Sequence, residues 1–179
     1  MNRTRLTTLF LGLVLVLLFL FRSDTPSIER QKLGADALVL AFGDSLTYGY
    51  GAVEKSYPTQ LQRRIGRSVV NAGIPGEISS AGLKRLPGLL ERYHPELVIL
   101  CHGGNDILRR SSTEQLRSNL IAMIQLSRKS GAEVLLVGVP GFGLFGLHTV
   151  ALYEEIARER DLLYEGSILE KIENDTALK

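Results

Sequence analysis

The sequence predicts an α/β fold in which a mostly parallel, five-stranded sheet carries helices on both faces. Five short apolar runs alternate with four helical segments at the spacing of βα units. The first run, Leu38–Phe42, shows no polar alternation, which is typical of a strand buried on both faces of a parallel sheet. Apolar residues make up 45% of the 179 residues, so a domain of ordinary size can build a full core without disulfides or metal.

Each predicted strand is a short apolar run bounded by turn residues. The runs are Leu38–Phe42, Ser68–Ala72, Leu97–Cys101, Glu133–Val139 and Leu162–Tyr164. Glycine follows the first three runs closely, and it permits the sharp turn that leads a buried strand into a loop. The segment Pro140–Leu147, after the fourth run, is predicted to be a loop rich in glycine and aromatic residues.

The predicted helices are marked by caps, breakers and an apolar face. They comprise a segment that opens at Ser56, followed by residues 79–93, 113–129 and 149–160. Pro58 suits the first turn of the first helix, and Pro95 stops the second. A capping pattern at Ser112 or Thr113 opens the third. After the last strand, only Ile168–Ile172 has a weak amphipathic pattern.

The N-terminus has the pattern of a targeting segment. Arg3 and Arg5 precede the uncharged apolar run Leu9–Phe21, which Arg22 closes, and no small-residue cleavage site follows. We therefore favour an uncleaved signal anchor over a cleaved signal peptide. The predicted organisation is an anchor or signal peptide (1–22), a tether (23–36) and one domain (37–179). The domain is expected to be exported to the periplasmic side of the inner membrane, or secreted if the segment is cleaved.

Charge argues against nucleic-acid binding, and cysteine content excludes an internal disulfide. The formal net charge of +2 is spread through the chain, which argues against a nucleic-acid surface. The single cysteine, Cys101, allows no internal disulfide and is expected to pack as a small apolar residue. Nothing in the sequence implies a metal or an organic cofactor.

Three polar positions follow the first three predicted strands and could form one site. Ser45, Gly76 and Asn105 are each about one βαβ unit apart, so they should converge at one edge of the sheet. A serine nucleophile, a glycine N–H and an asparagine amide are the parts of an acyl-transfer site, because the last two can stabilise an oxyanion. The alternative for Ser45 alone is a helix N-cap.

The motifs around these positions resemble those of the SGNH (GDSL) hydrolase family. GDSLT at Gly43–Thr47, the loop Asn71–Gly76 and GGND at Gly103–Asp106 look like its first three sequence blocks. The similarity runs from about residue 38 to 170 and is closest to the thioesterase, arylesterase and lysophospholipase branch. It implies a flavodoxin-like three-layer α/β/α sandwich, with Ser45 as nucleophile. It also implies an oxyanion hole formed by the N–H groups of Ser45 and Gly76 and the Asn105 amide.

The sequence departs from that family in one block. The family's Asp-x-x-His motif, which supplies the general base after the fifth strand, does not occur in these residues. His94 is expected at a helix end, His102 in strand-end packing, and His148 has no evident orienting partner. We therefore expect a C-terminally incomplete domain that lacks the final helix and the base, and that hydrolyses esters weakly.

The sequence thus predicts a serine esterase that acts on aryl esters, thioesters or lysophospholipids. Phe142 and Phe145 are candidates for a wall against the acyl chain, although a hydrophobic plug over the core is an equal alternative. A carbohydrate O-deacetylase could use the same site. A protein that binds acyl groups or lipids without catalysis is the alternative from another class, because the general base is missing. The expected partners are the substrate and the membrane, and the oligomeric state is left open.

Overall fold

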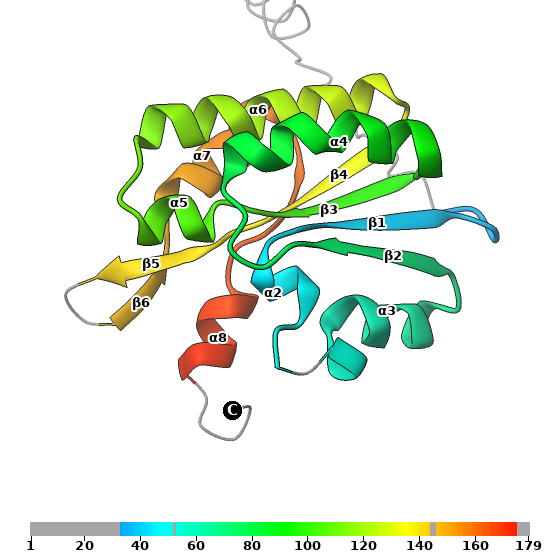
Figure 1. The fold of residues 1–179 in the computed structure, drawn as a ribbon, viewed down its shortest axis with the longest axis horizontal. Coiled ribbons are helices and arrows are strands. Elements are labelled where there is room, and N and C mark those ends of the chain that lie inside the picture. The colour runs from blue at the N-terminus through cyan, green and yellow to red at the C-terminus, as the bar shows by residue number, and fades with distance from the viewer. Residues whose placement is uncertain (1–32, 52, 144–145, 175–179) are drawn as a thin grey trace, which may run out of the picture. The chain divides into compact units, whose positions relative to one another are not determined.

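A five-stranded parallel sheet with helices on both faces forms the body of the molecule (Figure 1). The computed structural model describes residues 33–51, 53–143 and 146–174. The strands of the main sheet are β1 (Leu38–Gly43), β2 (Ser68–Gly73), β3 (Leu97–Cys101), β4 (Glu133–Val137) and β7 (Leu163–Glu165). Their order is β2-β1-β3-β4-β7, and every pair is parallel. The predicted fold class is confirmed.

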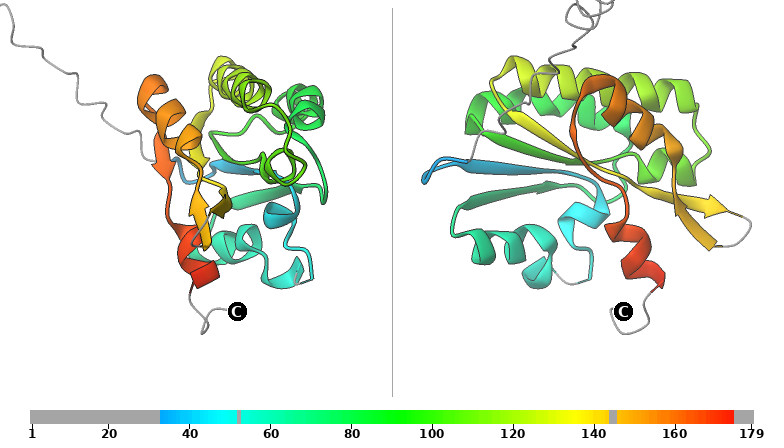
Figure 2. Two further views of the ribbon diagram at one scale, coloured as in Figure 1. Left: turned by 90° about the vertical axis from the view of Figure 1, so that its left-hand side faces the viewer. Right: turned by 180° about the vertical axis from the view of Figure 1, so that it is seen from behind.

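The helices are divided between the two faces of this sheet. On one face lie α4 (Ser79–Tyr93), α6 (Thr113–Lys129) and α7 (Ala151–Arg160). On the other lie α3 (Tyr57–Ile65) and the short α8 (Ile168–Asn174), as Figure 2 shows from two further sides. The observed bounds of α4 and α6 are the predicted ones. Ser112 caps the start of α6, and Pro95 follows the end of α4. The weak amphipathic stretch near the C-terminal end forms α8.

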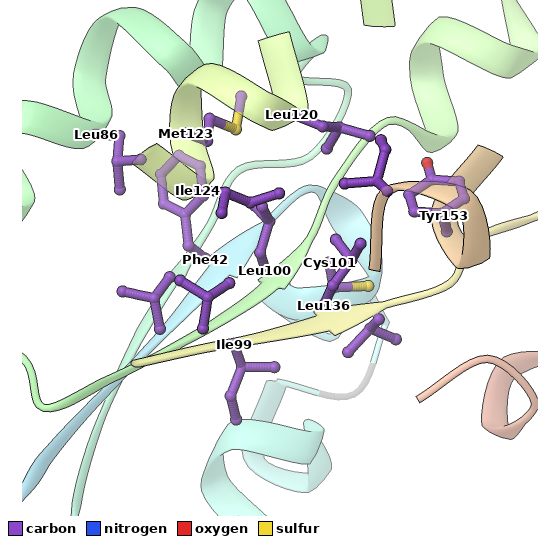
Figure 3. Close-up of a cluster of buried hydrophobic side chains, with 14 of the residues drawn as sticks. Phe42, Leu86, Ile99, Leu100, Cys101, Leu120, Met123, Ile124, Leu136 and Tyr153 are labelled. Atoms are coloured by element: carbon purple, nitrogen blue, oxygen red, sulfur yellow. The ribbon is translucent and has the colours of Figure 1, made fainter. Parts of the chain in front are cut away.

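The core is densest around the two central strands. Every residue of β1 after Leu38 and every residue of β3 after Leu97 is buried, whereas β2 at the sheet edge is half exposed. Phe42 and Leu100 pack against Leu120 and Met123 of α6 (Figure 3). The absence of polar alternation in the first predicted strand therefore reflects helices on both faces of the sheet.

Cys101 packs in this core as a small apolar residue, as predicted. Its side chain is buried and the thiol is free. Burial raises the pKa of the thiol to about 12, so the reactive thiolate is suppressed at neutral pH.

The prediction of a loop at Pro140–Leu147 is wrong. The structure has an antiparallel hairpin there, formed by β5 (Pro140–Gly143) and β6 (Gly146–Thr149), with Gly141 opposite His148. Glycine-rich strands lack the local pattern that predicts a strand, and their pairing depends on neighbouring elements. Here α5 (Gly104–Leu108) contacts β5, and α8 contacts β6. The side chain of Phe142 and the whole of Phe145 lie outside the described residues, so their proposed wall remains a prediction.

Short helical turns complete the description. These are α2 (Ser45–Tyr48), α5 and the 3₁₀ turn η1 (Val53–Lys55), none of which is long enough to produce a helical period in sequence. Residues 1–32, which include the predicted anchor and most of the tether, lie outside the described residues. Across the ranges that are described, no helix combines the length and apolar character that crossing a bilayer requires.

Candidate active site

Ser45 occupies the start of the helix that follows the first strand. Asp44 caps α2, because its side chain accepts a hydrogen bond from the Leu46 N–H at 3.1 Å. Ser45 is the first helical residue, so the cap alternative considered for it belongs to Asp44. The N–H of Ser45 therefore has no intrahelical acceptor, and it is one of the free N–H groups that form the positive end of the helix dipole.

Glycine is required on both sides of this turn. A Cβ on Gly43 would overlap the carbonyl oxygen of Cys101 and the hydroxyl of Thr47. A Cβ on Gly73 would overlap the backbone of Tyr48. The strand ends can therefore approach the Ser45 turn closely only because these two residues lack side chains.

Gly76 lies in the loop between β2 and α4. Its φ of +77° is in the left-handed region that glycine adopts without strain. Ile74 ties this loop to β1, with its N–H 3.1 Å from the Gly43 carbonyl oxygen, and Arg109 donates to the Gly76 carbonyl oxygen at 3.1 Å. Among the described residues, the Gly76 N–H has no hydrogen-bond acceptor, so it is available to a ligand.

Asn105 joins the three predicted positions. Its side-chain nitrogen lies 3.0 Å from the carbonyl oxygen of Glu77, the residue after Gly76. The same nitrogen lies 3.4 Å from Oδ2 of Asp44, the residue before Ser45. The Asn105 amide thus contacts the neighbours of both other residues, and the predicted convergence of the three strand ends is observed.

Asp44 is the buried carboxylate at the centre of this arrangement, with 2% of its surface exposed. Burial raises the pKa of Asp44, and N–H groups of Leu46 and Gly104, together with nearby His102, counter part of that rise. Its interactions make it a structural cap that also holds Asn105.

Asp106 braces the helix that carries Asn105. It accepts hydrogen bonds from the N–H of Ser79 at 2.8 Å and from the Ser79 hydroxyl at 2.6 Å. Asn119 of α6 in turn donates to the same hydroxyl at 2.8 Å. This buried network connects α5 to the start of α4 and to α6, and it accounts for the burial of Asp106.

Sequence reasoning missed a second cluster, formed by Glu77, Arg85 and His102. Arg85 and Glu77 form an ion pair at 2.7 Å, and His102 Nε2 lies 3.1 Å from Glu77 Oε2. His102 is fully buried and packs against Phe42 in a tilted arrangement with 5.6 Å between ring centroids. Its predicted packing role is confirmed, but its partner was not foreseen. The only sequence signal for this cluster was the spacing of eight residues between Glu77, beside the glycine loop, and Arg85.

The other two histidines lie elsewhere. His94 ends α4 in a left-handed conformation with φ of 43°, as expected for a helix-end residue. His148 is 57% exposed at its side chain and lies 3.6 Å from Glu170 of α8. This contact, which sequence reasoning did not foresee, forms because α8 packs against β6, but it is longer than a hydrogen bond and does not orient the imidazole.

Comparison with known proteins identifies the family of this chain. Residues 41–165 match the GDSL-like Lipase/Acylhydrolase family. The chain is 40% identical over 122 residues to the esterase TesA of Pseudomonas aeruginosa, covering 63% of this chain and 60% of that protein. It is 36% identical over 140 residues to an arylesterase of Vibrio mimicus, covering 73% of this chain and 66% of that protein.

A solved structure shows the same architecture. The SGNH-hydrolase family esterase AlinE4 superimposes with a TM-score of 0.71 at 31% identity, covering 83% of this chain and 85% of that one. The chain spans less than two thirds of the length of the two curated relatives. The matched region nevertheless contains all three motif positions at the sheet edge. The chain therefore belongs to the GDSL-like lipase/acylhydrolase family.

Proposed function

We propose that this domain is a serine esterase that cleaves acyl esters through Ser45. The observation that carries the proposal is the position of the Asn105 amide, within hydrogen-bond distance of groups beside both Ser45 and Gly76. An arrangement of this kind can stabilise a negative oxygen next to a serine nucleophile.

In the proposed reaction, Ser45 Oγ attacks the carbonyl carbon of the ester and the carbonyl oxygen becomes an oxyanion. The leaving alcohol or thiol departs with a proton, and water then hydrolyses the acyl-serine. The N–H groups of Ser45 and Gly76 are two proposed donors to the oxyanion. Both lack protein acceptors among the described residues.

The Asn105 amide is the third proposed donor. One of its hydrogens is directed to the Glu77 carbonyl at 3.0 Å, which fixes the plane of the amide. The other hydrogen has only a long contact of 3.4 Å to Asp44. This second hydrogen makes no short hydrogen bond, so it is the one that is available to an oxyanion.

The proton of Ser45 requires an acceptor that the described site does not supply. His102 is unsuitable, because it is fully buried and its Nε2 is engaged by Glu77. By resemblance, the acceptor belongs to an Asp-x-x-His block, which these 179 residues do not contain. Hydrolysis by this chain alone is accordingly expected to be slow. It is not expected to be absent, because a serine hydrolase that loses one triad member still retains roughly 10³–10⁴-fold catalysis over water.

The proposed substrates are aryl esters, thioesters and lysophospholipids. Support comes from the relatives, which are named esterase, arylesterase, and thioesterase and lysophospholipase. Exposed apolar side chains also lie beside the three motif positions, namely Leu46, Ile74 and Leu108. They suit an acyl chain better than a carbohydrate.

The test is covalent labelling of Ser45. The chain is incubated with an alkyl fluorophosphonate, and the adduct is located by peptide mass spectrometry. The matched control is Thr59→Ala, because Thr59 is a hydroxyl residue on α3 that belongs to none of the three sequence motifs. We expect an adduct on Ser45 that Ser45→Ala abolishes and Thr59→Ala does not. An undiminished adduct in Ser45→Ala would contradict the assignment, and binding of a lysophospholipid without adduct or hydrolysis would favour the non-catalytic alternative.

We also propose that residues 1–22 anchor the domain at the periplasmic side of the inner membrane. The basis is Arg3 and Arg5 ahead of the apolar run Leu9–Phe21. Cell fractionation should recover the intact chain in membranes, released by detergent but not by high salt. A soluble product that starts near Ser23 would show that the segment is a cleaved signal.

A further inference from the structure

We propose that Arg85, Glu77 and His102 form a positioning cluster that holds the oxyanion donors Gly76 N–H and Asn105 in place. This inference rests on the proposed function, because it assigns a role in the proposed esterase site. None of the three residues needs to contact the substrate. They act through the loop between β2 and α4.

Arg85 is the residue that ties the strand ends together. Its Nη2 donates to the carbonyl oxygen of Ala72 at 2.7 Å and lies 3.3 Å from that of Gly43. These carbonyls are at the ends of β2 and β1, just before the loop and the Ser45 turn. The guanidinium also lies 4.3 Å from the centre of the Phe42 ring. A single cation from α4 therefore fixes both strand ends relative to each other.

Glu77 connects this cation to the loop itself. Arg85 Nε lies 2.8 Å and 3.0 Å from the two carboxylate oxygens of Glu77, and Nη2 lies 2.7 Å from one of them. The Glu77 side chain is only 7% exposed, so its position is defined by these bonds. Its own backbone carbonyl accepts the hydrogen bond from Asn105. Holding the Glu77 side chain thus holds the acceptor that orients the Asn105 amide.

His102 brings the third strand end to the same carboxylate. It follows β3 directly and stands three residues before Asn105. Its Nε2 lies 3.1 Å from Glu77 Oε2, and its carbonyl accepts a hydrogen bond from the buried hydroxyl of Tyr153 at 2.9 Å. Because an ionised carboxylate only accepts hydrogen bonds, Nε2 of His102 is the donor in this pair.

The composition of the cluster favours positioning over packing alone. His102 Nδ1 is buried and has no hydrogen-bond partner among the described residues, which carries a free-energy cost. An apolar side chain would fill the same space without that cost. Burial alone would raise the pKa of Glu77, but hydrogen bonds from Arg85 and His102 outweigh it, so the pKa is lowered and the carboxylate stays ionised.

The decisive variant is Arg85→Met, which keeps an unbranched stem over Phe42 and removes every hydrogen bond of the guanidinium. The matched control is Arg92→Met on the same helix, since Arg92 only stacks over Tyr93 at 5.1 Å. The probe is an alkyl fluorophosphonate reacting with Ser45 of the full chain. Hydrogen exchange of residues 74–78 and the side-chain amide resonances of Asn105 are measured alongside.

We expect Arg85→Met to slow phosphonylation of Ser45 by up to about 10²-fold, because a misplacement of about 1 Å that originates away from the reacting atoms can cost that much. The loss should lie in the maximal rate and not in the concentration for half-saturation. Exchange of residues 74–78 should rise, the Asn105 amide resonances should shift, and Arg92→Met should change none of these. Arg85→Lys should not restore the rate, because an ammonium cannot bond two carbonyls and a carboxylate in one plane.

If Arg85→Met does not fold, Glu77→Gln keeps the size of the side chain and gives the same readouts. A folded Arg85→Met or Glu77→Gln chain with a parental phosphonylation rate and unchanged Asn105 resonances would overturn the proposal, even if its thermal stability fell. A parent chain that never reacts at Ser45 would instead refute the proposed function. The exchange and resonance measurements would still report whether the cluster positions the loop.

Discussion

Two histidine–carboxylate pairs in this molecule differ mainly in their depth. In the pair His102–Glu77 the side chains are 0% and 7% exposed, and 3.1 Å separates the two atoms. In the pair His148–Glu170 they are 57% and 34% exposed, with 3.6 Å between the atoms. The first pair lies where three parallel strands end, and the second joins the hairpin to α8.

The difference shows that residue types alone do not determine what such a pair contributes. Water screens the outer pair, and exposed ion pairs of this kind contribute about 0–1 kcal/mol. The inner pair is shielded from water. When one partner is removed, the other therefore remains as a buried polar group without a hydrogen-bond partner. The variants below test this contrast between the buried pair at the sheet edge and the exposed pair.

The largest effect is expected where the buried edge has no room. Gly43→Ala places a Cβ against the Cys101 carbonyl and the Thr47 hydroxyl, and should destabilise the fold by about 3 kcal/mol. Gly88→Ala is the control, because a Cβ there meets nothing within 4 Å and an exposed helical alanine should stabilise by about 0.5–1 kcal/mol. Urea unfolding followed by circular dichroism measures both. Equal midpoints for the two variants would contradict the packing described for the turn.

Breaking the inner pair should cost somewhat less. Glu77→Gln removes the charge that Arg85 and His102 bind, and should lower the free energy of unfolding by about 2 kcal/mol at pH 7. The folded-state pKa of Glu77 is lowered, since hydrogen bonds from its two partners outweigh the opposing effect of burial. The stabilisation is therefore present above the unfolded pKa and is lost as the pH falls through the folded value.

Urea midpoints of the parent and Glu77→Gln should accordingly converge as the pH is lowered from 7 toward 3. Glu133→Gln is a suitable control, because Glu133 is exposed at the start of β4. A difference that is the same at every pH would show that the Glu77 charge does not contribute.

The hydrogen bonds of Asp106 should contribute about 1–2 kcal/mol to the free energy of unfolding. Asp106→Asn keeps one acceptor but replaces the other oxygen with a donor, which conflicts with the Ser79 N–H or hydroxyl. A double-mutant cycle with Ser79→Ala sharpens the test. Because both changes disrupt the same hydrogen bond, their effects on the free energy of unfolding should be less than additive. Full additivity would mean that the two side chains act independently.

The smallest effect is expected for the outer pair. His148→Gln and Glu170→Gln should each change the free energy of unfolding by less than about 0.5 kcal/mol at pH 7, and added salt should reduce even that. The urea midpoints at low and high salt measure this. A loss as large as that of Glu77→Gln would remove the contrast between the two pairs.

Much of the fold could be predicted because its signals are local. Residues 79–93 and 113–129 each carry an apolar face, Ser112 caps the second segment and Pro95 follows the first, and both segments form helices with those bounds. The buried strands were also predictable, because each appears in the sequence as an unbroken apolar run. The convergence of Ser45, Gly76 and Asn105 was also predictable, because parallel strands that are joined by helices end at one edge of the sheet.

Other features depended on contacts between residues distant in sequence. The hairpin β5–β6 is glycine-rich and acquires its strand character from pairing and from the neighbouring α5 and α8. The Glu77–Arg85–His102 cluster combines a loop, a helix and a strand end, and Glu77 and His102 are separated by 25 positions. His148 likewise meets Glu170 only because α8 folds against β6.

Sequence by itself therefore determined the five strands of the parallel sheet, the four longer helices between them and the edge at which the motif residues lie. Periodicity and turn chemistry encode those features within a few residues. The tertiary structure alone decided which charged groups are buried and what they bind. That outcome depends on desolvation and on hydrogen-bond geometry, which exist only once the strand ends and α4 have come together.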